Sequence, residues 1–206
     1  MVKILFENKS NFFNLFRKVL IKRDTIDNKV DKKVQDIIEK VKKQSDSALL
    51  KFTKELDKFD ANNFDQLVVK KNEINDSLSK IDRDVLDSLK FAIKRITNYH
   101  KRQIPKNDFF KDKQGVFLGG IWNPIDAVGL YVPGGTASYP SSLLMNAIPA
   151  IVAGVNRIVI AVPAVEGFMN PIILACANLL GIKEIYKIGG AQAVAALALG
   201  TKRIKN

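Results

Sequence analysis

The sequence is poor in the side chains that bind metals and cross-link chains. Among 206 residues there is one cysteine, Cys176, and one histidine, His100. One cysteine excludes an internal disulfide framework and any zinc cluster built from cysteines. One histidine excludes every site that needs two imidazoles. The shortage of cysteine also indicates a reducing compartment.

An uninterrupted hydrophobic segment is missing as well. The longest run without a charged side chain spans residues 127–156, and Pro133, Pro140 and Pro149 interrupt it. The apolar residues at the N-terminus are mixed with charged ones from Lys3 onward, unlike the core of a secretory signal. We therefore expect neither an export signal nor a membrane contact, and the cytoplasm is the favoured location.

Basic residues outnumber acidic ones by 33 to 21, which gives a net charge of +12. Residues 1–113 hold 27 Lys/Arg and 18 Asp/Glu, whereas residues 114–206 hold 6 and 3. This change predicts a helical N-terminal region, 1–113, followed by a separate, apolar domain, 114–206. A basic balance can indicate nucleic-acid binding. Here lysines are mixed with acidic residues, as on solvated helix faces, so no nucleic-acid partner is expected.

Amphipathic helices are predicted in the first region. Apolar residues recur at helical spacing in 30–41 and again in 48–56, where Ser45 or Asp46 is the expected N-cap. A longer helix is predicted from about residue 79 to residue 102. We expect these helices to dock through their apolar faces.

The second region alternates between short β-branched runs and helical segments. Strands are predicted at 127–132, 157–162 and 184–188, each followed by a largely apolar helix. Strands this apolar are typical of a parallel sheet covered on both faces. The sequence therefore predicts an α/β fold whose strands all end at one edge, where such sheets bind ligands.

Glycine-bearing turns follow two of these strands. One is Tyr131-Val132-Pro133-Gly134-Gly135-Thr136-Ala137-Ser138, and the other is Ile188-Gly189-Gly190-Ala191-Gln192-Ala193. Glycine allows a ligand to approach the backbone closely, and the start of the next helix offers free N–H groups to an anion. Neither turn matches the dinucleotide fingerprint or the P-loop. Spacing alone therefore predicts a cleft for a small molecule and no more.

The identity of the residues in these turns extends the interpretation. The segments AVGLYVPGGTA (127–137) and GGAQAVAALALGT (189–201) closely resemble the histidinol dehydrogenase family. Upstream, the segment SDSALLKFTKELDKFD (45–60), the Tyr99-His100 pair with Gln103, and Asn123-Pro124-Ile125 are similar to that family too. The resemblance covers roughly residues 30–201 and is most specific at the two glycine turns.

The resemblance implies the N-terminal half of a zinc-dependent enzyme that oxidises L-histidinol to L-histidine with NAD. It implies an incomplete Rossmann-like sheet of three β-α units, in which Tyr131 and Gln192 contact NAD from neighbouring strand ends. The family's zinc ligands, its acid/base pair and a third NAD contact, an asparagine, belong to a second half that is not in this sequence. The resemblance therefore implies a partial NAD site, no metal ligand and no catalytic residue in this chain, which would be catalytically incomplete. His100 matches a helical position that is not a family metal ligand, so it is interpreted as a structural or surface histidine. Cys176 lies in an apolar helix with no base beside it, so it is interpreted as a buried small residue and not as a nucleophile.

Other functions remain open at this stage. The chain could instead be a non-catalytic module whose half-sheet binds a nucleotide or a partner for regulation. An enzyme half would gain activity when a separate C-terminal half is supplied, whereas such a module would not. We also expect homo-oligomers, because the apolar faces of helices 30–43 and 79–102 would stay partly uncovered.

Overall fold

A computed structural model describes residues 4–24, 28–134 and 139–206. The α-helices are α1 (Phe12–Asp24), α2 (Asn28–Gln44), α3 (Asp46–Leu56), α4 (Lys71–Asn75), α5 (Arg83–Lys101), α6 (Pro140–Ala153), α7 (Pro171–Leu179) and α8 (Gly190–Leu199). The strands are β1 (Asp108–Lys111), β2 (Phe117–Gly120), β3 (Ala127–Tyr131), β4 (Arg157–Ala161) and β5 (Glu184–Tyr186). Short 3₁₀ helices cover Phe64–Leu67, Asp76–Lys80 and Val165–Gly167. None of the helices in the described ranges is long and apolar enough to cross a membrane.

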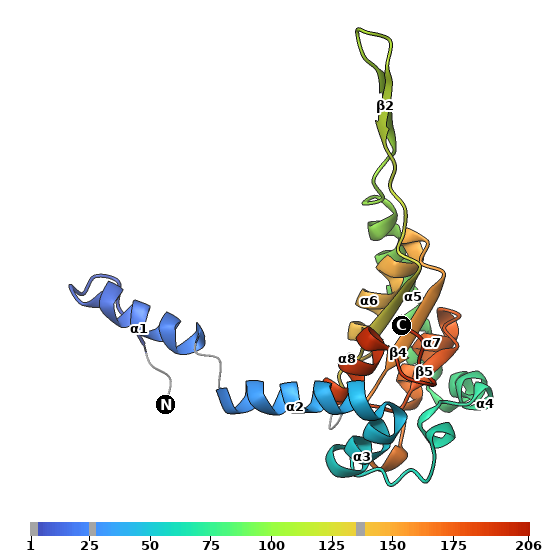
Figure 1. Ribbon diagram of the computed structural model, residues 1–206. Helices are drawn as coiled ribbons and strands as arrows, with labels where there is room; N and C mark the ends of the chain where they lie inside the picture. The colour runs from blue at the N-terminus through green and yellow to red at the C-terminus, as the bar shows by residue number, and fades with distance from the viewer. Residues whose placement is uncertain (1–3, 25–27, 135–138) are drawn as a thin grey trace.

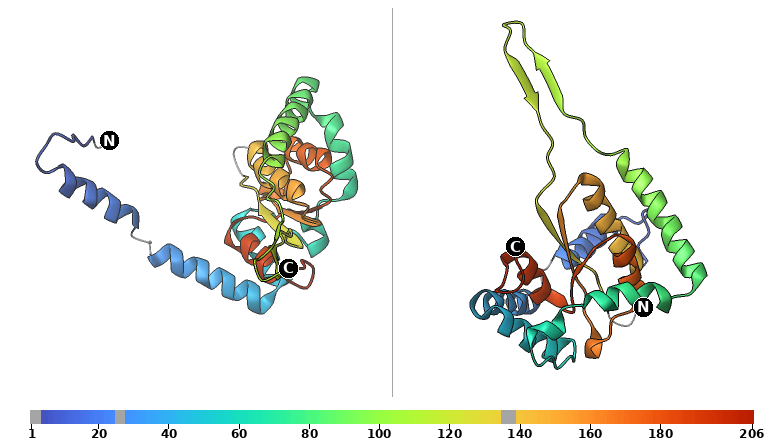
Figure 2. Two further views of the ribbon diagram at one scale, coloured as in Figure 1. Left: turned by 90° about the horizontal axis from the view of Figure 1, so that it is seen from above. Right: turned by 90° about the vertical axis from the view of Figure 1, so that its right-hand side faces the viewer.

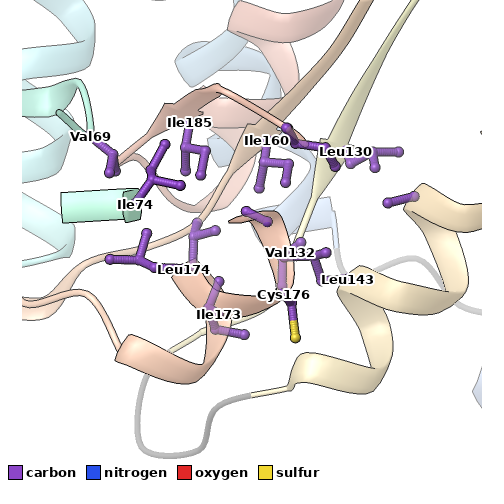
Figure 3. Packing of buried hydrophobic residues seen from close by; sticks show 14 of the residues in the cluster. Val69, Ile74, Leu130, Val132, Leu143, Ile160, Ile173, Leu174, Cys176 and Ile185 are labelled. Atoms are coloured by element: carbon purple, nitrogen blue, oxygen red, sulfur yellow. The ribbon is translucent and has the colours of Figure 1, made fainter. Parts of the chain in front are cut away.

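Strands β3, β4 and β5 form a parallel sheet in that order (Figure 1). Leu130, Ile160 and Ile185 lie side by side across it, and all three point into a core shared with α6 and α7 (Figure 3). The alternate residues of β4, Val159 and Ala161, face a second core built with α2, α3 and α8. The sheet is therefore covered on both faces, and the predicted α/β fold with three β-α units is confirmed.

The two edges of this sheet differ. An extended segment at residues 67–69 runs antiparallel to β5: the Val69 N–H donates to the Ile185 carbonyl at 2.9 Å, and the Lys187 N–H donates to the Leu67 carbonyl at 2.6 Å. Among the described residues no strand pairs with the outer edge of β3. Helix α8 follows β5 in the chain and packs against β3 and β4. The chain thus returns from β5 to the side of the sheet where β3 lies.

The predicted N-terminal helices form, with corrected details. Helix α5 starts at Arg83 and not near Ser79, because residues 76–80 form a 3₁₀ turn and Asp82 is the N-cap. Ser45 is the N-cap residue of α3, but its hydroxyl accepts the Lys202 N–H at 2.9 Å and makes no hydrogen bond to the helix. The hydroxyl thus joins α3 to the C-terminal segment.

The apolar faces of α2 and α5 are covered at their centres and stay exposed at Val30 and Tyr99, so the expectation of partly uncovered faces holds for these residues. Leu89 of α5 is buried in the core with α6 and α7, and Ile37 and Val41 of α2 are buried against α8. Residues from both sides of position 113/114 therefore share both cores. The division into 1–113 and 114–206 remains a prediction about domains, and position 113/114 lies in the turn between β1 and β2.

Further exposed apolar surface lies on two projecting elements. Strands β1 and β2 form an antiparallel hairpin that extends away from the body, as does α1 (Figures 1 and 2). All eight hairpin-strand residues are exposed, and the rings of Phe109 and Phe117 stack with their centroids 5.7 Å apart. Phe110 and Leu118 lie directly opposite each other in the register. The hairpin is therefore apolar on both faces, a feature the sequence reading did not anticipate.

Candidate functional site

The ends of the three parallel strands meet at Pro163, which follows β4. A Cβ atom on Gly189 would lie 2.5 Å from the Pro163 Cβ, and one on Gly134 would lie 2.9 Å from the Pro163 carbonyl oxygen. Real Cβ atoms do not approach other heavy atoms this closely. Both turns thus need glycine because each packs directly on the same proline. Gly135, Thr136, Ala137 and Ser138 of the first turn lie outside the described residues.

Tyr131 connects the first turn to the second. Its hydroxyl accepts the Gly190 N–H at 3.3 Å, and the side chain remains 36% exposed. Gly190 has φ of +61° at the first residue of α8, a conformation that favours glycine. The expectation that Tyr131 and Gln192 lie on neighbouring strand ends is wrong, because β4 separates β3 from β5. The tyrosine ring nevertheless reaches the second turn.

Gln192 lies in the first turn of α8 and is fully buried, at 0% exposure. Its Oε1 is 2.8 Å from the position that a Cβ on Gly190 would occupy, so the side chain folds back against that glycine. Neither of its amide atoms has a hydrogen-bond partner within the described parts of the chain. A buried amide without partners destabilises a protein by about 1–3 kcal/mol. Tyr131 and Gln192 thus meet at Gly190, one exposed and the other turned inward.

Asp57 is a residue of this edge that the sequence interpretation missed. It is 9% exposed, and its carboxylate accepts the Gly189 N–H. Burial raises the pKa of this carboxyl above its ordinary value, and the hydrogen bond from Gly189 opposes that shift. In sequence, Asp57 merely follows an amphipathic helix, and no motif separates it from the surface acids nearby.

A small pocket of about 190 Å³ lies beside Tyr131. It is lined by Gly129, Tyr131, Val194, Leu197 and Ala198, between the open edge of β3 and helix α8. A second pocket of about 320 Å³ lies at the base of the hairpin. There His100, Gln103, Asn123 and Pro124 come together, so two of the family-like segments meet. The His100 Nδ1 is 2.7 Å from the Gln103 Oε1.

Two other possibilities, a reactive Cys176 and a metal site, have no support among the described residues. Cys176 is buried in α7, and burial raises the pKa of its thiol to about 12, so it stays protonated at neutral pH. In 4–24, 28–134 and 139–206, no group of three or more His, Cys, Asp or Glu side chains could hold a metal ion.

A parallel sheet covered on both faces, with glycine turns at its carboxyl edge, defines this protein as a Rossmann-like α/β protein. Within the described ranges, one edge of that sheet is open. The chain belongs to the histidinol dehydrogenase family, whose model matches residues 21–206.

Individual relatives agree with this assignment. The chain is 45% identical over 205 residues to the histidinol dehydrogenase of Brucella abortus (strain 2308), covering 100% of this chain and 47% of that one. It is 48% identical over 195 residues to the enzyme of Agrobacterium fabrum, covering 95% and 45%. The crystal structure of histidinol dehydrogenase from Elizabethkingia anophelis superimposes with a TM-score of 0.80 at 34% identity, covering 86% of this chain and 40% of that one. The chain thus spans about half the length of the curated relatives it matches.

Proposed function

We propose that this chain supplies the NAD-binding part of a histidinol dehydrogenase, which oxidises L-histidinol to L-histidine. The observation that carries the proposal is the hydrogen bond between Tyr131 and Gly190. It brings the two most family-like turns together at the carboxyl edge of the sheet, the edge at which proteins of this fold bind dinucleotides. The cytoplasm is the location we propose, on the low cysteine content alone.

NAD would accept the hydride, and this chain's residues would hold it. The Tyr131 hydroxyl can exchange its contact with Gly190 for one to the cofactor, which would free the Gly190 N–H at the start of α8. Gln192 must turn out of its buried position before its amide can contact a ligand. The missing partners of that amide favour this movement, since both of its polar atoms would gain hydrogen bonds.

The described residues do not fit the zinc ion that the family resemblance implies. A single imidazole, that of His100 near the end of α5, cannot build such a site. No step through zinc is therefore assigned to this chain. We propose that the metal ligands and the acid/base groups come from a second polypeptide segment.

Titration with NAD tests the cofactor site. We expect weak binding, with a Kd on the order of millimolar or above, because a cleft normally has a second wall that this half does not supply. Tyr131→Ala and Gln192→Ala should each weaken binding about five- to tenfold, as each removes a hydrogen-bonding partner. Ligand-observed NMR measures affinities in this range.

Matched controls are Tyr99→Ala on α5 and Gln114→Ala in the hairpin turn, both exposed and distant in sequence from the edge. Neither should change the affinity. Equal binding by wild type and both site variants would show that Tyr131 and Gln192 are not cofactor contacts.

We further propose that the partner of this chain is the remaining half of a histidinol dehydrogenase. Two features support this: the open edge of β3, where a further parallel strand can pair, and the apolar hairpin. A two-stranded hairpin is marginally stable in water on its own, and exposed apolar patches of this kind mark contact surfaces. Without that half, we expect copies of the chain to associate through the same surface.

Sizing chromatography tests this association. Wild type should elute as oligomers, and the double substitution Phe109→Ser with Phe117→Ser should shift the protein toward the monomer, because it removes the stacked ring pair. Phe91→Ser, an exposed phenylalanine of α5, serves as the control and should leave the profile unchanged. A monodisperse wild-type monomer would contradict the proposal.

A non-catalytic module that binds a nucleotide or a partner is the second candidate function. The fully buried Gln192 amide favours it, since a module would not need to present that group to a cofactor. Supplying the other half separates the two candidates, because only an enzyme half gains activity.

A further inference from the structure

Asp57 is a buried carboxylate at an edge where other carboxylates are exposed. It lies directly after α3, outside the sheet, yet its side chain reaches the turn between β5 and α8. The position of a Cβ on Gly189 would be only 3.0 Å from its Oδ1. Its Oδ2 is buried and has no partner among the described residues. Burying a carboxylate is unfavourable unless it is hydrogen-bonded. The hydrogen bond from Gly189 therefore offsets part of the cost of burying Asp57.

The backbone holds Asp57 in place from both directions. Its N–H donates to the Thr53 carbonyl at 3.0 Å, which ends α3, and its own carbonyl accepts the Glu166 N–H at 3.2 Å. Lys58 then takes φ of +57°, in the left-handed region, so the chain turns directly after Asp57. Since Glu166 belongs to the loop after β4, Asp57 is tied to the second strand end as well as to the third.

Gly189 is consequently held between two groups. Pro163 and the Asp57 Oδ1 both lie next to the position that a Cβ atom would occupy, at 2.5 and 3.0 Å, and the Asp57 carboxylate accepts the Gly189 N–H. The Gly189 carbonyl in turn accepts the Ala193 N–H at 3.2 Å and starts α8. The next N–H, that of Gly190, is the one that faces the Tyr131 hydroxyl.

We propose that Asp57 is a positioning residue for the dinucleotide turn: its carboxylate orients Gly189, so that the Gly190 N–H faces Tyr131 and the cofactor. This rests on the proposed function, because it assigns the turn to NAD. Hydrogen bonds to a charged acceptor are about twice as strong as neutral ones. Asp57 therefore acts on the ligand through the backbone and needs no contact with it.

The test compares Asp57→Ala with Asp57→Asn in the full chain. Alanine removes the acceptor, so the Gly189 amide proton should shift upfield and exchange at least about tenfold faster, and the affinity for NAD should fall about tenfold. Asparagine keeps an oxygen acceptor and should restore both readouts to within about threefold of wild type. Asp60→Ala, an exposed carboxylate of the same segment, is the control and should change neither.

Each result decides a different question. A Gly189 amide that is unprotected in wild type overturns the proposal without any variant, and so does an Asp57→Ala protein with wild-type protection and affinity. Asparagine behaving like alanine overturns the role of the acceptor oxygen. If wild type binds no NAD but its Gly189 amide depends on Asp57 as described, the cofactor assignment fails while the hydrogen bond that fixes the turn stands.

Discussion

Purified chain given NAD and L-histidinol is expected to form no NADH, with or without added zinc. Hydride transfer from an alcohol needs a base to take up the proton, and the family resemblance also implies a metal ion. The single imidazole, His100, is paired with Gln103 at the base of the hairpin, and no metal-binding cluster occurs among the described side chains. The same shortage predicts that elemental analysis will find no stoichiometric zinc.

Adding a polypeptide that carries the remaining half of a family member should restore turnover. General acid–base groups alone contribute about 10²- to 10⁴-fold, so we expect activity to rise at least that far above the chain alone. Absorbance of NADH at saturating L-histidinol measures it. Tyr131→Ala should lower the restored rate at limiting NAD, and Tyr99→Ala should not. Turnover by the chain alone, free of contaminating enzyme, would contradict the assignment, and no gain on complementation would favour the binding module.

The sheet could be predicted from sequence because its strands are nearly continuous apolar runs. Residues 157–162 and 184–188 contain the β-branched stretches that a parallel strand covered on both faces requires, and the flanking glycines and prolines mark their ends. Tyr131 could be found because it stands beside glycines whose order is distinctive. The position of Gln192 at the second turn could be found for the same reason, but its inward rotamer could not.

Three features could not be predicted, each for a physical reason. The strands of the hairpin are four residues long and apolar on both faces, so they show no alternation to detect. Asp57 acquires its role from a contact with Gly189, 132 positions later in the sequence. The cover over the apolar face of α5 also depends on long-range packing, which a helical period cannot indicate.

The second large effect concerns the centre of the sheet. Ile160→Ala should lower the free energy of unfolding by about 2–5 kcal/mol, because large-to-small changes at buried sites leave a cavity. Ile160 has 0% exposure and lies between Leu130 and Ile185 on the face toward α6 and α7 (Figure 3). Whole domains are stable by only about 5–15 kcal/mol, so this single change removes a large share of the total.

Thermal unfolding followed by circular dichroism, at one protein concentration because the chain is expected to associate, measures the effect. For a chain of this size 1 kcal/mol corresponds to roughly 2–4 °C in Tm, so Ile160→Ala should melt about 4–20 °C below wild type. Ile160→Val should lose only about 0.5–1.5 kcal/mol, and Ile121→Ala, at 63% exposure, should stay within about 0.5 kcal/mol of wild type. A wild type without a cooperative transition, or equal Tm values for Ile160→Ala and Ile121→Ala, would show that this half of the enzyme does not form its own core. Since Pro163 lies two residues after the end of β4 and contacts both glycine turns, the proposed NAD site would then also need a second polypeptide segment in order to form.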